Sequence, residues 1–389
     1  MTRTIEEINA KIKAGKVVVY TAEEVIGLVK EKGVSQTARE VDVVTTGTFG
    51  PMCSSGAYFN IKQSTPKIKC GGGRATFNGV PVYAGWAAAD LYLGCSALPD
   101  EDPRNAVYPG LFKYGGAHVI EDLVNGRTVR LAAQAYGTDC YPRKEYATEL
   151  GLGDFNNAVM FNPRNAYQLY NVAVNLSQRP IYTYMGVLRP RLGNANYSTA
   201  GALSPLLKDP QLRTVGLGSR VFFGGAEGYV VWPGTQHVAE PQRAANGLPL
   251  TPSATLALIG DLKQMSPRYL RAASMAGYGA TLAVGFGLPI PVLDEQVLLQ
   301  AAITDEEITY PIIDYSEAYP LARPGDLGRV SMAELMSGQI EVDGKKVPTG
   351  GLASRARARE VALELKQRIS DGRFYLTRPV APLPGAELA

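Results

Sequence analysis

The sequence predicts an α/β protein: one large mixed-sheet domain, rich in glycine and proline, with a small C-terminal helical appendage. Three observations predict this class. The chain has 389 residues, 46% apolar and 19% charged, so it can bury a sizeable core. Its 42 glycines and 26 prolines are spread along the chain, which is typical of many short strands joined by tight turns. Helix signals also alternate with short β-prone runs. We expect the main domain at residues 1–304 and the appendage at 305–389, packed on the same domain.

The N-terminal quarter combines both kinds of element. Helices are expected at 4–15 and 22–33, and strands at 16–20 and 41–46. Thr21 followed by two glutamates is a helix start, and Gly33 is a helix stop. Within 75–86, Asn78-Gly79 between β-prone flanks indicates a hairpin.

Further along, 116–124 reads as a helix closed by Asn125-Gly126, and 128–136 reads as a strand. Later strands are expected at 180–188, 214–223, 228–232, 255–259 and 281–285, and helices at 267–276 and 360–369. The proline-rich end after Thr377 is expected to be an exposed tail.

Composition excludes several classes of protein. A net charge of +3 is too small to indicate nucleic acid or an anionic membrane as a partner. No apolar run approaches the roughly 18 residues of a membrane span, and the polar first residues are unlike a secretory signal. Four cysteines in 389 residues do not form a disulfide framework. We therefore expect a cytoplasmic protein.

Two of the four cysteines are candidates for chemistry. Cys53 and Cys140 each follow a β-rich run and lie among small, polar, glycine and proline residues, where a thiol is exposed. If residues 54–56 opened a helix, its N–H groups would favour a thiolate at Cys53. Cys95 ends an apolar run and is expected to be a buried small hydrophobe. Two unrelated, inert loop cysteines remain the alternative.

Other familiar chemistries lack their motifs. The cysteine positions 53, 70, 95 and 140 contain no Cys-x-x-Cys pair, and the two histidines have no zinc-like spacing, so no metal is expected. The glycines after Cys70 lack the Lys-Ser/Thr of a phosphate loop. The later glycine runs complete no dinucleotide fingerprint, and no hydrolase elbow is present.

Six polar residues are weaker candidates for holding an anionic or polar substrate. They are Arg143, Arg164, Asn194, Asn196, His237 and Lys263. An arginine can bind a carboxylate through two hydrogen bonds, and His237 could act as an acid or base. Asparagines in glycine-rich loops commonly close turns, however, and basic side chains are usually solvated. Each therefore keeps a purely structural interpretation beside the functional one.

Four motifs resemble the homocysteine biosynthesis protein family, whose members are L-aspartate semialdehyde sulfurtransferases of methanogens and other anaerobes. They are 45–56 (TTGTFGPMCSSG), 136–144 (YGTDCYPRK), 161–168 (FNPRNAYQ) and 260–265 (GDLKQM). The resemblance runs from the first helix to about residue 380. It implies synthesis of L-homocysteine from L-aspartate semialdehyde, sulfide and a reductant, with Cys53 and Cys140 as counterparts of two essential cysteines.

The chain has no cluster motif of its own, so no bound cofactor is expected, and the resemblance implies an external reductant, either a ferredoxin-like electron-donor protein or a small thiol. Cys53 is then expected to carry sulfur as a persulfide and Cys140 to resolve it, although the order could be reversed. A homodimer is expected only from the general frequency of dimers. Two alternatives stay open: a non-catalytic sulfur-relay or scaffold protein, and a thiol-dependent redox enzyme acting on another aldehyde.

Overall fold

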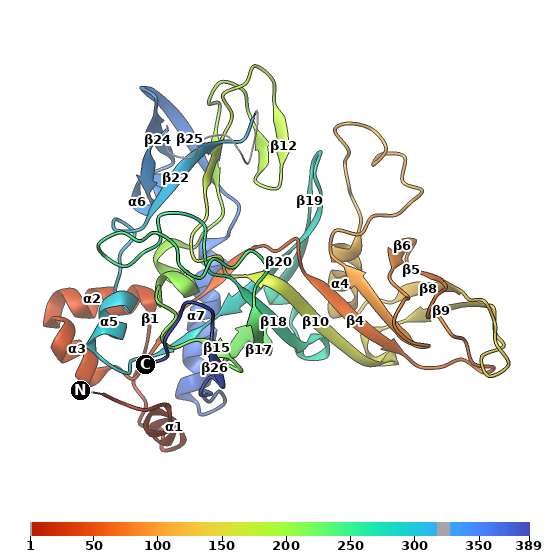
Figure 1. Ribbon diagram of the computed structural model, residues 1–389, viewed down its shortest axis with the longest axis horizontal. Coiled ribbons are helices and arrows are strands. Elements are labelled where there is room, and N and C mark those ends of the chain that lie inside the picture. The colour runs from red at the N-terminus through yellow and green to blue at the C-terminus, as the bar shows by residue number, and fades with distance from the viewer. Residues whose placement is uncertain (1, 317–326) are drawn as a thin grey trace.

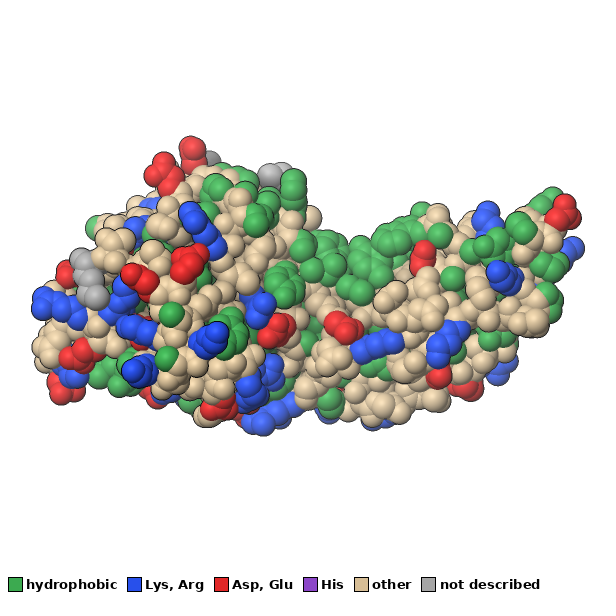
Figure 2. Space-filling model, turned by 90° about the horizontal axis from the view of Figure 1, so that it is seen from below, with side chains coloured by type: hydrophobic (Ala, Val, Ile, Leu, Met, Phe, Trp, Pro, Cys, Tyr) green, Lys and Arg blue, Asp and Glu red, His purple; other side chains and the backbone are tan. Residues whose placement is uncertain are grey.

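The computed structural model describes residues 2–316 and 327–389 and confirms a mixed α/β fold. Figure 1 shows a body that contains both termini and an arm that extends to one side of it. Seen from below, the molecule is hollowed between body and arm, and hydrophobic side chains cover this hollow (Figure 2). Within the described ranges, no helix has both the length and the apolar character that crossing a membrane requires.

The main sheet joins the body to the arm. Its strands run in the order β19-β20-β16-β17-β18-β10-β4-β7, and β3 pairs with β20 outside this path. Their bounds are β3 Thr48–Pro51, β4 Gly56–Ile61, β7 Asp90–Gly94, β10 Phe155–Asn165, β16 Arg220–Phe223, β17 Ala226–Pro233, β18 Leu256–Asp261, β19 Leu270–Met275 and β20 Gly279–Gly287. All of these pairings are antiparallel. The long strand β10 lies between β18 of the body and β4 of the arm, so it ties the two parts together.

Besides the end of the main sheet, the arm contains a second antiparallel sheet and one helix. The sheet has the order β6-β5-β8-β9, with bounds β5 Arg74–Phe77, β6 Val80–Val82, β8 Val129–Gln134 and β9 Glu145–Leu150. The expected hairpin is confirmed, because Asn78 and Gly79 both have positive φ between β5 and β6. The expected helix is confirmed as α4, Gly116–Val124, whose buried face packs mainly on β19 and β20 of the main sheet.

Two smaller sheets, two two-stranded ladders described below and the helices complete the body. One sheet has the order β23-β22-β11-β14-β25-β24, with bounds β11 Val172–Val174, β14 Ala195–Tyr197, β22 Thr309–Asp314, β23 Arg329–Ser331, β24 Gln339–Val342 and β25 Lys345–Gly351. The other is β1 Val19–Thr21, β2 Val43–Thr45 and β21 Pro289–Pro291. The remaining helices are α1 Ile5–Lys13, α2 Ala22–Lys32, α3 Val34–Glu40, α5 Glu295–Ala301, α6 Met332–Met336 and α7 Arg355–Ser370. Thr21 opens α2 with a capping box, as its sequence predicts.

Three expectations about elements are wrong. Residues 267–276 form only a 3₁₀ turn and then strand β19, because 270–275 pair with β20. The expected strand 180–188 is a hairpin of β12 Ile181–Thr183 and β13 Gly186–Leu188. The C-terminal segment is no free tail: β26 Ala381–Pro382 pairs with β15 Gly216–Leu217, and Leu383 is buried.

Gly47 allows α7 to lie against the strand that leads to the site. A Cβ at Gly47 would lie 2.1 Å from the carbonyl oxygen of Ala358, which is helix backbone and cannot rotate away. We expect Gly47→Ala to lower the free energy of unfolding by about 2–3 kcal/mol. Gly27→Ala is the control, because no atom lies within 4 Å of its added Cβ in α2. The Gly27→Ala change should raise the free energy of unfolding by about 0.5–1 kcal/mol. Urea unfolding of both variants is the measurement, and equal free energies of unfolding for the two would contradict the close contact between Gly47 and α7.

Lys208 is fully buried, and its Nζ donates to the carbonyl oxygen of Ile303. Burial lowers the pKa of Lys208 from 10.5 to about 7. Between these values the unfolded chain holds a proton that the folded chain has lost, so stability rises with pH in this window. We expect urea unfolding at pH 6, 7.5 and 9 to show the native protein gaining stability relative to Lys208→Met. The gain should be on the order of 1 kcal/mol per pH unit above pH 7. A difference that does not vary with pH would contradict a neutral Lys208.

Candidate functional site

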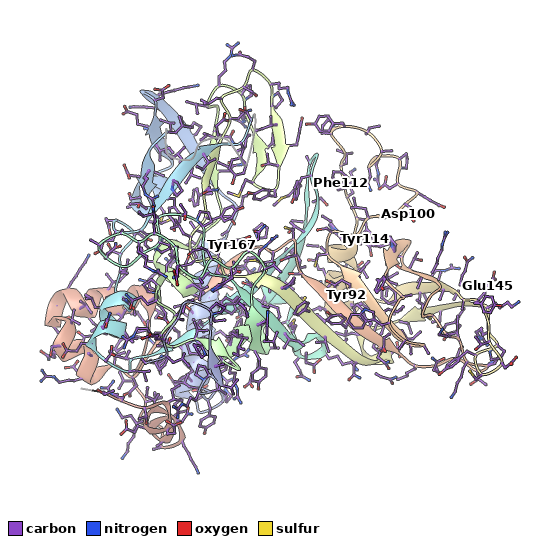
Figure 3. All side chains as sticks on the ribbon, in the orientation of Figure 1. Tyr92, Asp100, Phe112, Tyr114, Glu145 and Tyr167 are labelled. Carbon is purple, nitrogen blue, oxygen red and sulfur yellow. The ribbon has the colours of Figure 1, made fainter. Side chains whose placement is uncertain are left out.

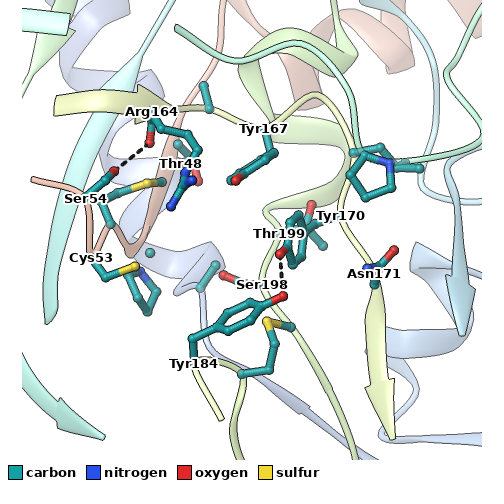
Figure 4. Close-up of a pocket in the computed structure, with 18 of the residues that line it drawn as sticks. Thr48, Cys53, Ser54, Arg164, Tyr167, Tyr170, Asn171, Tyr184, Ser198 and Thr199 are labelled. Carbon is teal, nitrogen blue, oxygen red and sulfur yellow. Dashed lines mark hydrogen bonds between the residues drawn. The ribbon is translucent and has the colours of Figure 1, made fainter. Parts of the chain in front are cut away.

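The candidate site is a cavity of about 580 Å³ at the meeting point of the main sheet and the smaller sheets. Its walls come from segments that are far apart in the sequence. They include residues of the segments 48–54, 164–171, 184–185, 198–205 and 275–281, together with Gln236 and Val238. Figure 4 shows Cys53, Ser54 and Arg164 on one side of the cavity and Tyr170 and Tyr184 across from them. The volume is ample for a molecule the size of an amino acid.

Cys53 lies in a tight turn between β3 and β4. The N–H of Ser55 donates to the carbonyl oxygen of Met52 at 3.0 Å, and Ser96 Oγ donates to the Cys53 carbonyl at 3.0 Å. The thiol is half-buried and lines the cavity. Residue 56 begins strand β4, so the helix that could have stabilised a Cys53 thiolate is not there, and that sequence interpretation is wrong. The strands hold the turn in place.

Asn162 fastens the Cys53 turn to the segment that bears Arg164. The amide is fully buried, and its Nδ2 donates to Ser55 Oγ at 2.8 Å. Its Oδ1 accepts from Ser54 Oγ at 3.3 Å and from the backbone N–H of Arg164 at 2.9 Å. One side chain therefore fixes the positions of Ser54 and Ser55, which follow Cys53 in the turn, and of Arg164.

Arg164 supplies the positive charge of the site. Among the described residues that line the cavity, it alone carries a charged side chain. Its guanidinium lies 5.9 Å from the ring centre of Tyr167 and has no ion pair or hydrogen bond with the described part of the chain. An arginine that no carboxylate neutralises, beside a half-buried thiol, is suited to binding an anionic group of a small molecule.

Tyrosine hydroxyls form the wall opposite Cys53. The Tyr184 hydroxyl bonds to those of Tyr170 and Tyr315, and Tyr167 donates to Gln236 Oε1 at 2.6 Å. Burial, followed by the neighbouring tyrosines, raises the pKa of Tyr184, so this phenol stays protonated at neutral pH. They offer neutral donors and acceptors to a polar substrate.

Thr281 is a site residue that sequence reasoning missed. It lines the cavity and is only 1% exposed, and its Oγ1 has no hydrogen-bond partner in the part of the chain that the structure describes. The N–H of Met52 donates to the carbonyl oxygen of Leu282, which sets Thr281 beside the Cys53 turn. Buried hydroxyls normally have a partner, so this one is available to a bound molecule.

The structure does not bring Cys140 to Cys53. Cys140 is exposed in the turn between β8 and β9, and it lines no part of the cavity. Figure 3 shows Glu145, which begins β9, near the far end of the arm, whereas Tyr167 of the cavity lies in the body. Arg143 is also on the arm, where it donates to the carbonyl oxygens of Thr65 and Pro66. A direct disulfide between Cys53 and Cys140 of one chain therefore does not fit this arrangement.

The other sequence candidates lie outside the cavity and make structural hydrogen bonds. Asn194 accepts from the Arg189 N–H at 2.6 Å, and Asn196 donates to the Met185 carbonyl at 2.7 Å, so both close the β13–β14 loop. Lys263 donates to the Phe155 carbonyl at 2.6 Å. The ring nitrogens of His237 contact the carbonyl oxygens of Thr255 and Pro384. Of the six weaker candidates, only Arg164 lines the cavity with Cys53.

No group of three or more His, Cys, Asp or Glu side chains in the described ranges could hold a metal ion. The site is therefore described by its thiol, its guanidinium and its hydroxyls. A pocket of this composition is typical of an enzyme that uses cysteine chemistry on a small anionic molecule.

Comparison with known proteins agrees with this class. Residues 17–376 match the model of the family described as homocysteine biosynthesis enzyme, sulfur-incorporation. The chain belongs to this family, as its motifs indicated, and it is an enzyme of the sulfurtransferase class.

Two relatives carry the name L-aspartate semialdehyde sulfurtransferase. That of Methanosarcina acetivorans is 48% identical over 384 residues, which cover 98% of this chain and 72% of that protein. That of Methanocaldococcus jannaschii is also 48% identical, over 99% of this chain and 74% of that protein. An uncharacterized protein of Methanothermobacter thermautotrophicus is 27% identical over 97% of this chain and 95% of its own length. No solved structure gives a significant match.

Proposed function

We propose that this chain converts L-aspartate semialdehyde and inorganic sulfide into L-homocysteine, using electrons from an external two-electron donor. The observation that carries the proposal is the cavity shared by the Cys53 thiol and the unneutralised Arg164 guanidinium. The two relatives at 48% identity, whose names include this substrate, support it.

The cavity suits each part of the proposed substrate. Arg164 binds the α-carboxylate, and the tyrosine wall and amide side chains provide oxygens for the α-ammonium. With its carboxylate on Arg164, the substrate directs its aldehyde towards Cys53, because both residues lie on the same side of the cavity (Figure 4). The Thr281 hydroxyl is placed to donate to the aldehyde oxygen or to the sulfur.

The overall reaction requires two electrons. Aldehyde, hydrogen sulfide, two electrons and two protons give the thiol and one water. In the proposed route sulfur is held on Cys53 as a persulfide, and its outer sulfur adds to the aldehyde carbon. A thiol then attacks Cys53 Sγ: the sulfur–sulfur bond of the adduct breaks, the outer sulfur leaves on the substrate with the electron pair, and Cys53 returns to the oxidation level of a disulfide. Loss of water from the released thiohemiacetal yields a thioaldehyde, which the external donor reduces with two electrons and two protons. Inorganic sulfide is already fully reduced, so it forms a persulfide only if Cys53 first stands at the oxidation level of a disulfide.

The experiment oxidises the purified chain once with a small disulfide, adds aspartate semialdehyde, sulfide and a two-electron donor that is not a thiol, and measures homocysteine. We expect steady turnover by this chain alone. Sulfide bound to Cys53 without homocysteine would favour the non-catalytic sulfur-relay interpretation, and turnover of unrelated aldehydes at a similar rate would favour a general thiol-dependent redox enzyme. Adding a ferredoxin-like protein to the same mixture tests whether it supplies the electrons.

A further inference from the structure

The sequence predicts that Cys95 is a buried small hydrophobe of the core. Its surroundings, however, differ from those of Cys70, the other buried cysteine. Cys70 and Cys95 are both fully buried. Burial alone raises the pKa of Cys70. Burial also raises the pKa of Cys95, and the nearby Cys53 thiol raises it further, whereas a hydrogen bond with Ser55 acts in the opposite direction. Cys95 is therefore electrostatically coupled to the thiol of the site, and Cys70 is not.

Backbone contacts place the two segments side by side. Strands β4 and β7 pair Gly56 with Gly94, and the Cys95 N–H donates to the Ser55 carbonyl at 2.8 Å. The next residue, Ser96, donates through Oγ to the Cys53 carbonyl at 3.0 Å. Residue 95 thus lies opposite a residue only two positions from Cys53. The same hydrogen bonds that hold the Cys53 turn in place therefore also hold it against the segment of Cys95.

A buried polar chain connects Cys95 to the catalytic side of the cavity. Ser55, whose carbonyl oxygen accepts from the Cys95 N–H, also accepts through its Oγ from Asn162 Nδ2 at 2.8 Å. Asn162 in turn accepts from the backbone N–H of Arg164. Hydrogen bonds therefore link residue 95 through Ser55 and Asn162 to the segment that bears Arg164, which is an unusual setting for a cysteine that only fills space.

We propose that Cys95 is the resolving thiol of Cys53, so that the sulfur-carrying cycle runs through a Cys53–Cys95 disulfide. This inference rests on the proposed function, in which Cys53 carries the sulfur. It replaces Cys140, which lies on the arm, as the partner of Cys53 within one chain.

The steps balance in atoms and electrons. A small disulfide oxidises the pair once by thiol–disulfide exchange. Hydrosulfide then attacks Cys53 Sγ: the new sulfur–sulfur bond forms, the bond to Cys95 breaks, and Cys95 leaves with the electron pair and takes up the proton. After the persulfide adds to the aldehyde carbon, Cys95 Sγ attacks Cys53 Sγ. The outer sulfur leaves on the substrate with the electron pair, and the disulfide forms again. The cycle consumes no electrons, so the external donor is needed only to reduce the thioaldehyde.

Burial decides which thiol receives the sulfur. Cys95 is 0% exposed, so sulfide from the cavity can reach only Cys53. A raised pKa also keeps Cys95 protonated and unreactive towards outside electrophiles until Cys53 is modified. The close position within one fold compensates for the small thiolate fraction, because intramolecular attack has a high effective concentration.

The test treats the native protein with oxidised glutathione, which reaches Cys53, and follows the products by mass spectrometry of peptides prepared without reductant. We expect a short-lived glutathione adduct on Cys53 that gives way to a Cys53–Cys95 disulfide. In Cys95→Ser the adduct should persist at least about 100-fold longer. Cys70→Ser, the matched buried control, and Cys140→Ser should behave as the native protein does. Cys95→Ala, checked for folding by thermal unfolding, repeats the test without an added hydroxyl.

A stable adduct on Cys53 of the native protein, or its resolution by Cys140, would overturn the inference. The outcome is separable from that of the proposed function. Sulfide treatment of the oxidised protein that yields a Cys53 persulfide without any Cys53–Cys95 disulfide removes only the role of Cys95. A Cys53–Cys95 disulfide that gives neither persulfide nor homocysteine instead removes the proposed function.

Discussion

Replacing Cys53 with serine is expected to lower the rate of homocysteine formation by about 1,000-fold or more. A serine side chain is close in size to cysteine and is compatible with the turn between β3 and β4, so the fold around residue 53 should be preserved. Its oxygen, however, cannot carry a sulfur atom as a persulfide, and it is far less nucleophilic than a thiol at neutral pH. Homocysteine formed under saturating sulfide and aspartate semialdehyde is the measurement.

Cys70→Ser provides the control for Cys53→Ser, because Cys70 is buried in the arm and lines no part of the cavity. Its activity should stay within about twofold of the native value, provided that thermal unfolding shows a folded protein. Near-native turnover by Cys53→Ser would remove the carrier role from this thiol and return attention to Cys140.

Local sequence signals were sufficient where a structure depends on neighbouring residues. Thr21 and Glu24 form a capping box, so the start of α2 can be read from four residues. Asn78-Gly79 supplies the two positive φ angles of a tight hairpin, and Asn125-Gly126 ends α4. None of these depends on what packs against the segment.

Local sequence patterns predicted the wrong element where pairing with a distant strand determines the conformation. Ser266-Pro267 opens a helical turn as expected, but residues 270–275 then pair along their whole length with β20. That partner cannot be seen in the local pattern, and pairing with it outweighs helix propensity. The C-terminal segment is similar, because β15 holds residues 381–382 although the surrounding prolines suggested a tail.

Site residues could be predicted from the sequence only where they lie in distinctive local motifs. Cys53 and Arg164 occur in distinctive local motifs, and both line the cavity. Thr281 and Tyr184 come from strands and loops with no such motif, and only the sheet pairing of β3 with β20 brings Thr281 to the thiol. The role proposed for Cys95 depends on the hydrogen bond between its backbone N–H and the Ser55 carbonyl. The apolar run that ends at Cys95 gives no sign of this long-range contact.

Arg164→Gln is expected to raise the KM for aspartate semialdehyde by about 100-fold, because removing a guanidinium from a carboxylate leaves that charge unpaired within the cavity. Glutamine keeps much of the side-chain length and can still donate one hydrogen bond. Arg164→Lys should fall between glutamine and arginine, since an ammonium retains the charge but not the two parallel hydrogen bonds. Steady-state kinetics with varied aldehyde and saturating sulfide separate these cases.

The loading of sulfur on Cys53 should be unaffected by Arg164→Gln, because Arg164 acts on the carboxylate and not on the sulfur. The yield of Cys53 persulfide after sulfide treatment is therefore the matched internal readout. Arg130→Gln is the surface control, because Arg130 is an exposed residue of β8 on the arm and leaves the cavity unchanged. An unchanged KM in Arg164→Gln would show that the carboxylate binds elsewhere. A lost persulfide with an unchanged KM would place Arg164 in sulfur loading instead.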